Sequence, residues 1–266
     1  MIVKRFAILG AIAMLPAFAE AQNAPTDMDT LAPRQHRPIR DRVEHGDGTS
    51  TSSNWSGYAV LGSSFTSAKG SWTVPTATCG TGYQFASFWV GLDGYYSDTV
   101  EQTGTDSDCD GANPSYYAWY EFYPHASFNI ASLTIKPGDQ ISASVVYSGA
   151  AFTITIKNET SGESFSKTSL VAGAKRSSAE WIAEAPCCTA KGAILPLADF
   201  GTLPFGEDAT AVSNTNYATD SATSGGIGQF SKIEEITMAT RSGALEAVPT
   251  LLSSDGTSFS VTWFSK

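Results

Sequence analysis

Two glutamates lie four residues apart in the segment SAEWIAEAP at 178–186. In an extended strand successive side chains alternate between faces, so Glu180 and Glu184 would share one face and Trp181 would occupy the other. If Trp181 packs in a core, both carboxyls face a groove or solvent. A carboxyl on a concave, aromatic-lined face can act as a general base or acid. The alternative is a solvated strand face, which this segment alone favours.

A glutamine with apolar neighbours occurs in the segment SFWVGLDGYYSDTVEQTGTD at 87–106. We expect a strand in which Gln102 shares its face with Val100, opposite Glu101. A buried amide is costly without partners, but one that donates and accepts can orient a water and then stabilise an oxyanion. A core amide with satisfied hydrogen bonds is the alternative.

An acid flanked by aromatic side chains occurs in YAWYEFYP at 117–124. Trp119, Glu121 and Tyr123 alternate with period two and would therefore share one face of a strand. Such a face could line a cleft that binds a peptide or a sugar. Packing alone is the alternative explanation.

Several common hydrolytic arrangements are absent from the sequence. It has no G-x-S-x-G or H-E-x-x-H motif, no Asp-Thr/Ser-Gly motif, and no C-x-x-C spacing that would suggest zinc. Outside residues 1–52 the only histidine is His125, for which we expect a structural or surface role. The candidate chemistry therefore rests on carboxyl and amide groups, and we expect no cofactor and no metal.

Residues 1–21 match a secretory signal peptide. Lys4 and Arg5 precede an apolar run from Phe6 to Phe18, and Ala19-Glu20-Ala21 provides a cleavage motif. The run is shorter than the ~20 residues that a membrane span requires. We expect a secreted protein without a membrane partner, extracellular or, in a host with an outer membrane, periplasmic.

Residues 22–52 have the composition of a pro-segment, rich in Pro, Asp, Thr and Arg and without aliphatic periodicity. A disordered extension without a role is the alternative. We expect a single folded domain at 53–266. The pro-segment contains a basic cluster made of Arg34, Arg37, Arg40 and Arg42.

The net charge of −10 lies wholly in residues 54–266, because the acidic and basic residues before them are equal in number. Such a domain lacks the basic face that displaces counterions from nucleic acid, so we expect no nucleic-acid partner. An acidic surface with few lysines also gains little positive charge at low pH, which suits an acidic medium.

Alternation of apolar and polar residues predicts half-buried strands at 140–147, 152–156 and 258–264. Turn signals such as Pro137-Gly138-Asp139 separate the segments. No helical stripe of useful length follows the signal peptide. The sequence therefore predicts an all-β fold, either a sandwich or a barrel.

The chain has four cysteines, and disulfides are expected in an exported protein. A bond between the adjacent Cys187 and Cys188 would close an unusual, strained ring. We therefore expect these two to form long-range links to Cys79 and Cys109.

Six segments form an ordered set: NWSGYAV at 54–60, FWVGLDG at 88–94, VEQTGTD at 100–106, YAWYEFYP at 117–124, KPGD at 136–139 and AEWIAEAP at 179–186. Each is modest by itself, but together and in this order they resemble the eqolisin family of glutamic peptidases. The resemblance covers most of the predicted domain and is weakest after about residue 190. The resemblance implies a lectin-like sandwich of two antiparallel sheets, with a catalytic pair on a concave face.

The resemblance assigns the family's catalytic glutamine to Gln102 and its catalytic glutamate to Glu184. Glu184 would take a proton from a water that it shares with Gln102, the water would attack the scissile carbonyl, and Gln102 would donate to the oxyanion. Glu184 would then protonate the leaving amine. Glu180 would be supporting or structural.

Other positions match the surroundings of the family's active site. One departure is Tyr117, where family members commonly carry an acid, and the cysteine pattern also differs. The residues that we expect to bind substrate or support the pair are Trp89, Asp93, Asp106, Trp119 and Glu121.

The resemblance implies a secreted acid endopeptidase that acts on protein or peptide substrates. We expect the enzyme to be a monomer. Its own pro-segment would be a partner, with the arginine cluster docked on the acidic domain while the carboxylates are ionised. Protonation would loosen this contact, and we expect self-cleavage within 46–53.

Two other functions fit parts of the sequence. A secreted carbohydrate-binding module would use Trp89, Trp119 and Tyr123 as stacking platforms, and its binding would survive loss of Gln102 and Glu184. A glycoside hydrolase would use a carboxyl pair such as Glu121 and Glu184.

Overall fold

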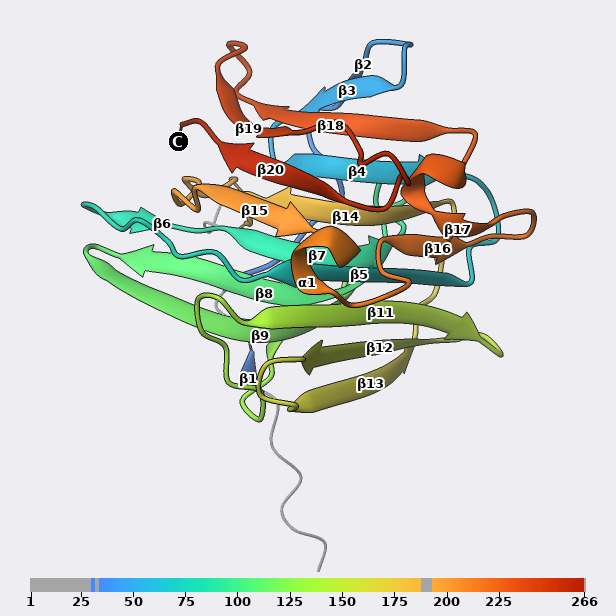
Figure 1. Ribbon diagram of the computed structural model, residues 1–266, viewed down its shortest axis with the longest axis horizontal. Helices are drawn as coiled ribbons and strands as arrows, with labels where there is room; N and C mark the ends of the chain where they lie inside the picture. Colours follow the sequence, from blue (N-terminus) through green and yellow to red (C-terminus); the bar gives the residue numbers. More distant parts are fainter. Residues whose placement is uncertain (1–29, 32–33, 188–192, 266) are drawn as a thin grey trace, which may run out of the picture.

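The computed structural model describes residues 30–31, 34–187 and 193–265. Strands form nearly all of its regular structure, so the predicted all-β class is confirmed (Figure 1). The helices in this described part are single turns, α1 (Glu207–Thr210) and η1 (Ile227–Gln229). Neither is long and apolar enough to cross a membrane. The predicted signal peptide lies outside the described residues.

A long, twisted sheet, here called the first sheet, contains the strands that carry Gln102, Glu121 and Glu184. These three side chains lie on its outer face. In order across it, the strands are β2 (Val43–Glu44), β3 (Thr49–Ser52), β18 (Ile233–Ala239), β4 (Trp55–Leu61), β14 (Ser178–Glu184), β7 (Ser87–Leu92), β8 (Val100–Asp110), β9 (Asn113–Tyr123), β10 (Phe128–Asn129) and β1 (Thr30–Leu31). The short β6 (Tyr83–Gln84) pairs with the end of β8.

A second sheet packs against the inner face of the first. In order across it, the strands are β19 (Leu245–Pro249), β20 (Phe259–Trp263), β15 (Thr202–Phe205), β5 (Ser67–Thr73), β11 (Gln140–Ser148), β12 (Ala151–Asn158) and β13 (Ser164–Leu170). β16 (Tyr217–Thr219) also pairs with β5, and β17 (Ser224–Gly226) pairs with β16. The predicted sandwich is confirmed, and the three strands predicted from alternation are β11, β12 and β20.

Two features refine the predicted antiparallel sandwich. β3 runs parallel to β18, whereas the other pairs are antiparallel. β18 also pairs with β19, so the hydrogen-bonded ladder continues from one sheet into the other.

Large apolar side chains fill the space between the sheets, and two indole N–H groups tie the sheets together. Trp72 Nε1 on β5 donates to Thr105 Oγ1 on β8 at 2.9 Å. Trp181 Nε1 on β14 donates to the carbonyl oxygen of Lys69 on β5 at 2.8 Å. A buried indole needs such a partner. These bonds fix β8 and β14 against β5, and therefore fix which faces of β8 and β14 point outward.

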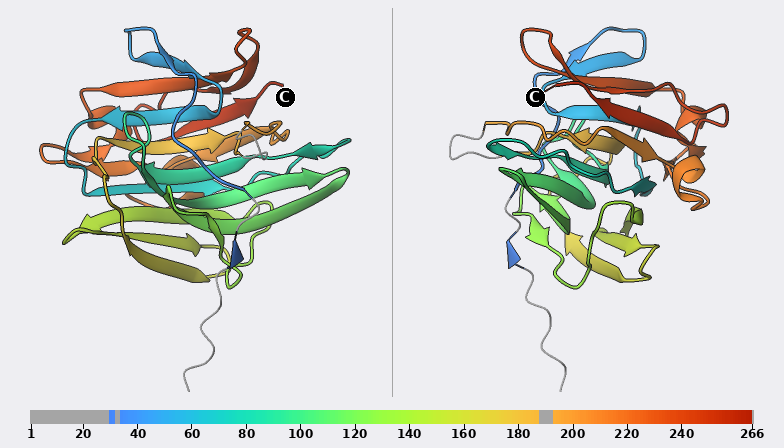
Figure 2. Two further views of the ribbon diagram at one scale, coloured as in Figure 1. Left: turned by 180° about the vertical axis from the view of Figure 1, so that it is seen from behind. Right: turned by 60° about the vertical axis from the view of Figure 1, so that its left-hand side comes forward.

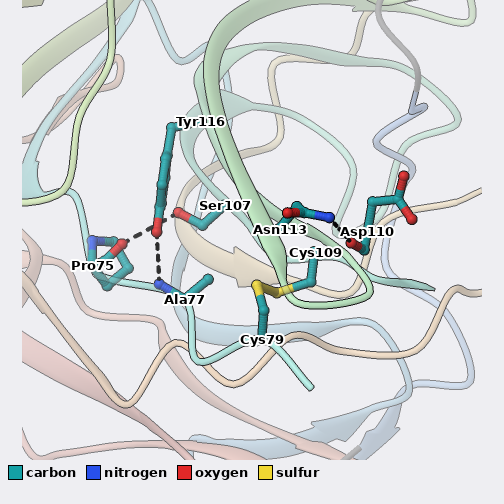
Figure 3. The surroundings of a disulfide bond; sticks show 8 residues. All are labelled: Pro75, Ala77, Cys79, Ser107, Cys109, Asp110, Asn113 and Tyr116. Atoms are coloured by element: carbon teal, nitrogen blue, oxygen red, sulfur yellow. Dashed lines mark hydrogen bonds between the residues drawn. A yellow bond between two sulfur atoms is a disulfide. The ribbon is translucent and has the colours of Figure 1, made fainter. Parts of the chain in front are cut away.

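One disulfide joins Cys79 to Cys109, which lies near the end of β8 (Figure 3). The expectation that both cysteines link to the 187–188 pair is therefore wrong. The antiparallel β8 and β9 form a long hairpin that carries Cys109 away from the outer face and towards the loop after β5. In that loop, Ala77 N donates to Tyr116 Oη of β9 at 3.1 Å. Cys188 lies outside the described residues.

The segment at 34–42 crosses the outer face of the first sheet. In the left-hand view of Figure 2, the blue chain passes over this face from β1 towards β2. Farther along, β3 adds itself to β18, so part of the predicted pro-segment belongs to the first sheet. The boundary between residues 52 and 53 stays a prediction.

Gly57→Ala should separate β4 from β14. Gly57 has a φ of 140°, and an added Cβ would overlap the carbonyl oxygen of Trp181. Backbone strain together with overpacking costs about 2 kcal/mol or more. Urea unfolding monitored by tryptophan fluorescence should show this loss. Gly80→Ala is the control, because nothing lies within 4 Å of an added Cβ there. Equal stability of the two variants would contradict the argument.

Two carboxyls of the first sheet, Glu101 and Glu180, are completely buried. Burial, with a smaller contribution from Asp93, raises the pKa of Glu101 to about 9. Burial likewise raises the pKa of Glu180 well above its usual range. The oxygens of both side chains lack a hydrogen bond of ordinary geometry within the described residues. Protonation is therefore what allows their burial.

Stability should fall as the pH rises above 4.5, the ordinary pKa of glutamate. Above that value the unfolded chain releases the Glu180 proton while the folded protein keeps it, so each pH unit favours unfolding by up to about 1.4 kcal/mol. Glu180→Gln removes this part of the slope. Urea unfolding at pH 4 to 8 measures it, with Asp98→Asn, a change at an exposed carboxyl, as the control. An unchanged slope in Glu180→Gln would rule out a proton on Glu180.

Candidate active site

Strand β14 presents Glu180, Ile182 and Glu184 on the outer face of the first sheet, whereas Trp181 packs between the sheets. The alternation predicted for this segment is confirmed. Both glutamates are nevertheless buried rather than solvated, and segment 34–42 covers Glu184, to which the backbone N of Arg37 donates.

The Glu184 carboxyl receives N–H donors on both oxygens. Trp89 Nε1 donates to Oε2 at 2.8 Å, and the backbone N of Arg37 donates to Oε1 at 3.1 Å. Asn54 Nδ2 lies 3.4 Å from Oε1. Burial raises the pKa of Glu184 to about 8, while the charge of His36 and the N–H donors oppose the shift. Glu184 therefore combines a high proton affinity with donors that stabilise its ionised form.

Gln102 lies on β8, on the same outer face. Its Nε2 lies 3.2 Å from the carbonyl oxygen of His36 and 3.3 Å from Glu121 Oε2. Both neighbours are acceptors, so the amide nitrogen must point towards them. The side chain is fully buried, and its Oε1 has no hydrogen-bond donor within the described residues. Gln102 is thus placed to donate to one carbonyl group and to accept from a further donor.

Tyr117 replaces the acid expected beside the aromatic strand and joins two aspartates. Its hydroxyl lies 2.7 Å from Asp106 Oδ2 and 3.1 Å from Asp108 Oδ2. Burial and the charge of Asp106 raise the pKa of Asp108 to about 8. A phenol has one proton to donate, so a protonated Asp108 can donate to Tyr117 while Tyr117 donates to Asp106. Tyr117 therefore links the two aspartates through its hydroxyl.

His36 fills the space between the acids. Its ring stacks on Trp119 with centroids 3.4 Å apart and planes 4° apart. Nε2 lies 2.9 Å from Ser87 Oγ and 3.3 Å from Asp106 Oδ1, and Nδ1 lies 3.3 Å from Glu121 Oε2. Burial alone would lower the pKa of His36, but the two acids raise it to about 10. His36 is therefore a buried cation.

Four of the five residues expected to support the pair lie around Gln102 and Glu184, namely Trp89, Asp106, Trp119 and Glu121. The fifth, Asp93, lies apart. Asp93, with a φ of 70° just after β7, accepts backbone N–H bonds at 2.7 to 2.9 Å from the loop at 175–177. This role fixes the chain just before β14.

Three members of the site were not predicted from the sequence, namely His36, Asn54 and Ser87. His36 was visible as a lone histidine between arginines, in a basic segment facing an acidic domain. Asn54 stands at the start of a recognised segment, but nothing in the sequence shows its contact with Glu184.

Comparisons with known proteins identify the family of this chain. The model of the Peptidase A4 family matches residues 53–246. Aspergillopepsin-2 from Aspergillus niger is 32% identical over 178 residues, or 58% of this chain and 62% of that protein. Scytalidopepsin B from Scytalidium lignicola is 38% identical over 118 residues, 44% of each protein. The match thus spans less than two thirds of either curated relative.

Solved structures show the same fold. Scytalido-glutamic peptidase with a transition state analog inhibitor has a TM-score of 0.67 and 26% identity, covering 80% of this chain and 98% of that one. Aspergilloglutamic peptidase from Aspergillus niger has a TM-score of 0.57 and 28% identity, covering 68% and 99%. The resemblance found in the sequence is confirmed, and this chain belongs to the Peptidase A4 family, the eqolisins.

Proposed function

We propose that this protein is a secreted endopeptidase that hydrolyses peptide bonds in acid through Gln102, Glu184 and one water. One observation carries the proposal. Gln102 on β8 contacts the carbonyl oxygen of the peptide group between His36 and Arg37, and Glu184 on β14 contacts the nitrogen of the same group. These are the two atoms on which negative charge and a proton must be placed during hydrolysis.

In this mechanism the ionised Glu184 takes a proton from water, and the water oxygen bonds to the scissile carbonyl carbon. Gln102 Nε2 donates to the oxygen that becomes negative, while its Oε1 can accept from the water. Glu184 then delivers the proton to the departing nitrogen. Trp89 and Asn54 hold the carboxyl in place through their N–H groups.

Two buried carboxyls, Asp108 and Glu184, should make the activity depend on pH. Asp108 loses its proton as the pH passes about 8, which places a second negative charge beside Asp106 and breaks the donor chain through Tyr117. Glu184 has its raised pKa while segment 34–42 buries it. Contact with water lowers this pKa when the segment leaves, so the ionised base becomes available in acid.

Peptides are the substrates that this chemistry fits. Solved relatives hold a peptide-based transition state analog and a tripeptide, Ala-Ile-His. The alternative of a sugar-binding platform gains nothing from the geometry, because Trp89 donates to Glu184 and Trp119 stacks on His36. The segment that covers the site is the predicted pro-segment, so we infer that the protein is made as a zymogen.

Gln102→Ala and Glu184→Gln should each lower kcat/KM on a denatured protein substrate by about 10²-fold or more, because one removes the oxyanion donor and the other the base. The assay runs from pH 2 to 8 with pepstatin present. A cleavage site for a specific protease in the turn at 46–48, of which residues 46 and 47 are exposed, allows the predicted pro-segment at 22–52, here called the leader, to be cut in every variant. Glu180→Gln, on the same strand and face, is the matched control and should stay active. Activity that survives in either variant of the pair would overturn the mechanism.

Trp89→Phe should shift the acidic limb of the kcat/KM profile to higher pH. The substitution removes the N–H that stabilises ionised Glu184. If that hydrogen bond contributes ~1.5 kcal/mol, its loss raises the pKa of Glu184 by about one unit. Trp55→Phe is the control, because Trp55 Nε1 donates to the carbonyl oxygen of Arg37 and not to Glu184. An unmoved limb in Trp89→Phe would mean that the limb reports another group.

A further inference from the structure

The peptide bond between His36 and Arg37 is held at both of its polar atoms. Gln102 Nε2 donates to the His36 carbonyl oxygen at 3.2 Å, and the Arg37 N–H donates to Glu184 Oε1 at 3.1 Å. The oxygen thus lies at the donor that would stabilise an oxyanion, and the nitrogen lies at the group that would protonate a leaving amine. This bond is therefore presented as a scissile bond.

The backbone on both sides of this bond is also fixed. Gln35 exchanges two backbone hydrogen bonds with Cys187, at 2.7 and 2.9 Å. The Arg37 carbonyl oxygen accepts from Trp55 Nε1 at 3.0 Å, and Ile39 N donates to the carbonyl oxygen of Gly94 at 3.2 Å. Main-chain bonds of this kind are how an extended peptide is bound in register.

The His36 side chain occupies a subsite built for a flat cation. Trp119 covers one face of the ring, while Asp106 and Glu121 lie at its two nitrogens. All four side chains are fully buried. A neutral aliphatic side chain here would leave two buried acids without a cation, which a polar site rejects strongly.

We propose that His36–Arg37 is the bond of its own leader that the enzyme cuts first, and that Trp119, Asp106 and Glu121 select histidine on the carbonyl side of the scissile bond in its substrates. The inference rests on the proposed peptidase function and names its substrate preference.

The reaction consumes one water. Its oxygen bonds to the His36 carbonyl carbon, and the bond to the Arg37 nitrogen breaks with the electron pair going to nitrogen. Glu184 carries one proton from the water to that nitrogen. The products are a carboxyl group on His36 and an amine on Arg37, and no other reactant is required.

The expected cleavage within 46–53 concerns a different part of the leader. Residues 49–52 form β3, whose backbone pairs with β18 and β2, so a protease reaches them only after local unfolding. His36–Arg37 needs no such step, because it already lies at Gln102 and Glu184. A cut within β3 would therefore follow the first one.

The first test follows the full-length precursor by intact mass and amino-terminal sequencing between pH 3 and 8. In the wild type the earliest new amino terminus should be Arg37, with a first-order rate independent of protein concentration. Glu184→Gln should lack it, and His36→Leu should form it at least about tenfold more slowly, with fluorescence spectra to check folding. A first cut elsewhere, with the 36–37 bond intact, overturns the proposal for the leader.

The second test measures kcat/KM of the leader-free enzyme on the peptide APRQHRPIRD, which has the sequence of residues 32–41, and on its His→Leu and His→Gln versions. We expect a preference for histidine of about tenfold or more. Asp106→Asn should reduce the ratio of the rates for the histidine and leucine peptides, a measure that a general loss of activity leaves unchanged. Equal rates for the three peptides overturn the subsite.

The two proposals fail in different ways. An enzyme that digests denatured protein but shows no preference for histidine refutes only the inference drawn here. An enzyme that cleaves neither protein nor peptide at any pH refutes the peptidase function, and the subsite with it.

Discussion

Burial of several carboxyl groups on one face of the first sheet is the constraint that the rest of the site must satisfy. An ionised carboxylate that leaves water without compensation costs several kcal/mol, so each such group needs a proton, an N–H donor or a cation. Glu180 keeps a proton, and Glu184 receives N–H groups from Trp89 and Arg37. Asp106 and Glu121 receive the cation of His36. The Arg37 N–H and the His36 cation come from the leader, and the cation is one reason why a basic segment fits an acidic domain.

The same constraint separates the roles of two identical residues. Glu180 and Glu184 share a strand, a face and complete burial. Glu184 has Trp89 and Asn54 as donors to its ionised form, whereas the Glu180 oxygens lack hydrogen bonds within the described part of the chain. Glu180 therefore keeps its proton over a wide pH range, which suits a structural carboxyl. Glu184 can exchange its proton, as a general base must.

Local pattern was enough to predict the faces of the strands, but not the partners that meet across them. Alternation placed Trp181 inside and Glu184 outside, and the structure agrees, because the period of a strand depends on neighbouring residues alone. The disulfide prediction failed because Cys79 meets Cys109 only when the loop after β5 packs against the β8–β9 hairpin, which is a tertiary contact. His36 was missed for the same reason. A histidine outside the predicted domain becomes part of the site only when segment 34–42 crosses the sheet.

A leader that lies in substrate register must be explained as an inhibitor as well as a substrate. The geometry at His36–Arg37 is suited to cleavage, so it cannot by itself delay the reaction. The protonation state of Glu184 can delay the cleavage. With the leader in place, burial raises the pKa of Glu184 to about 8, and below that value each pH unit reduces the ionised fraction about tenfold. Cleavage of the bound leader should therefore slow as the pH falls below about 8, so acid favours the leader-free enzyme and does not by itself speed the first cut.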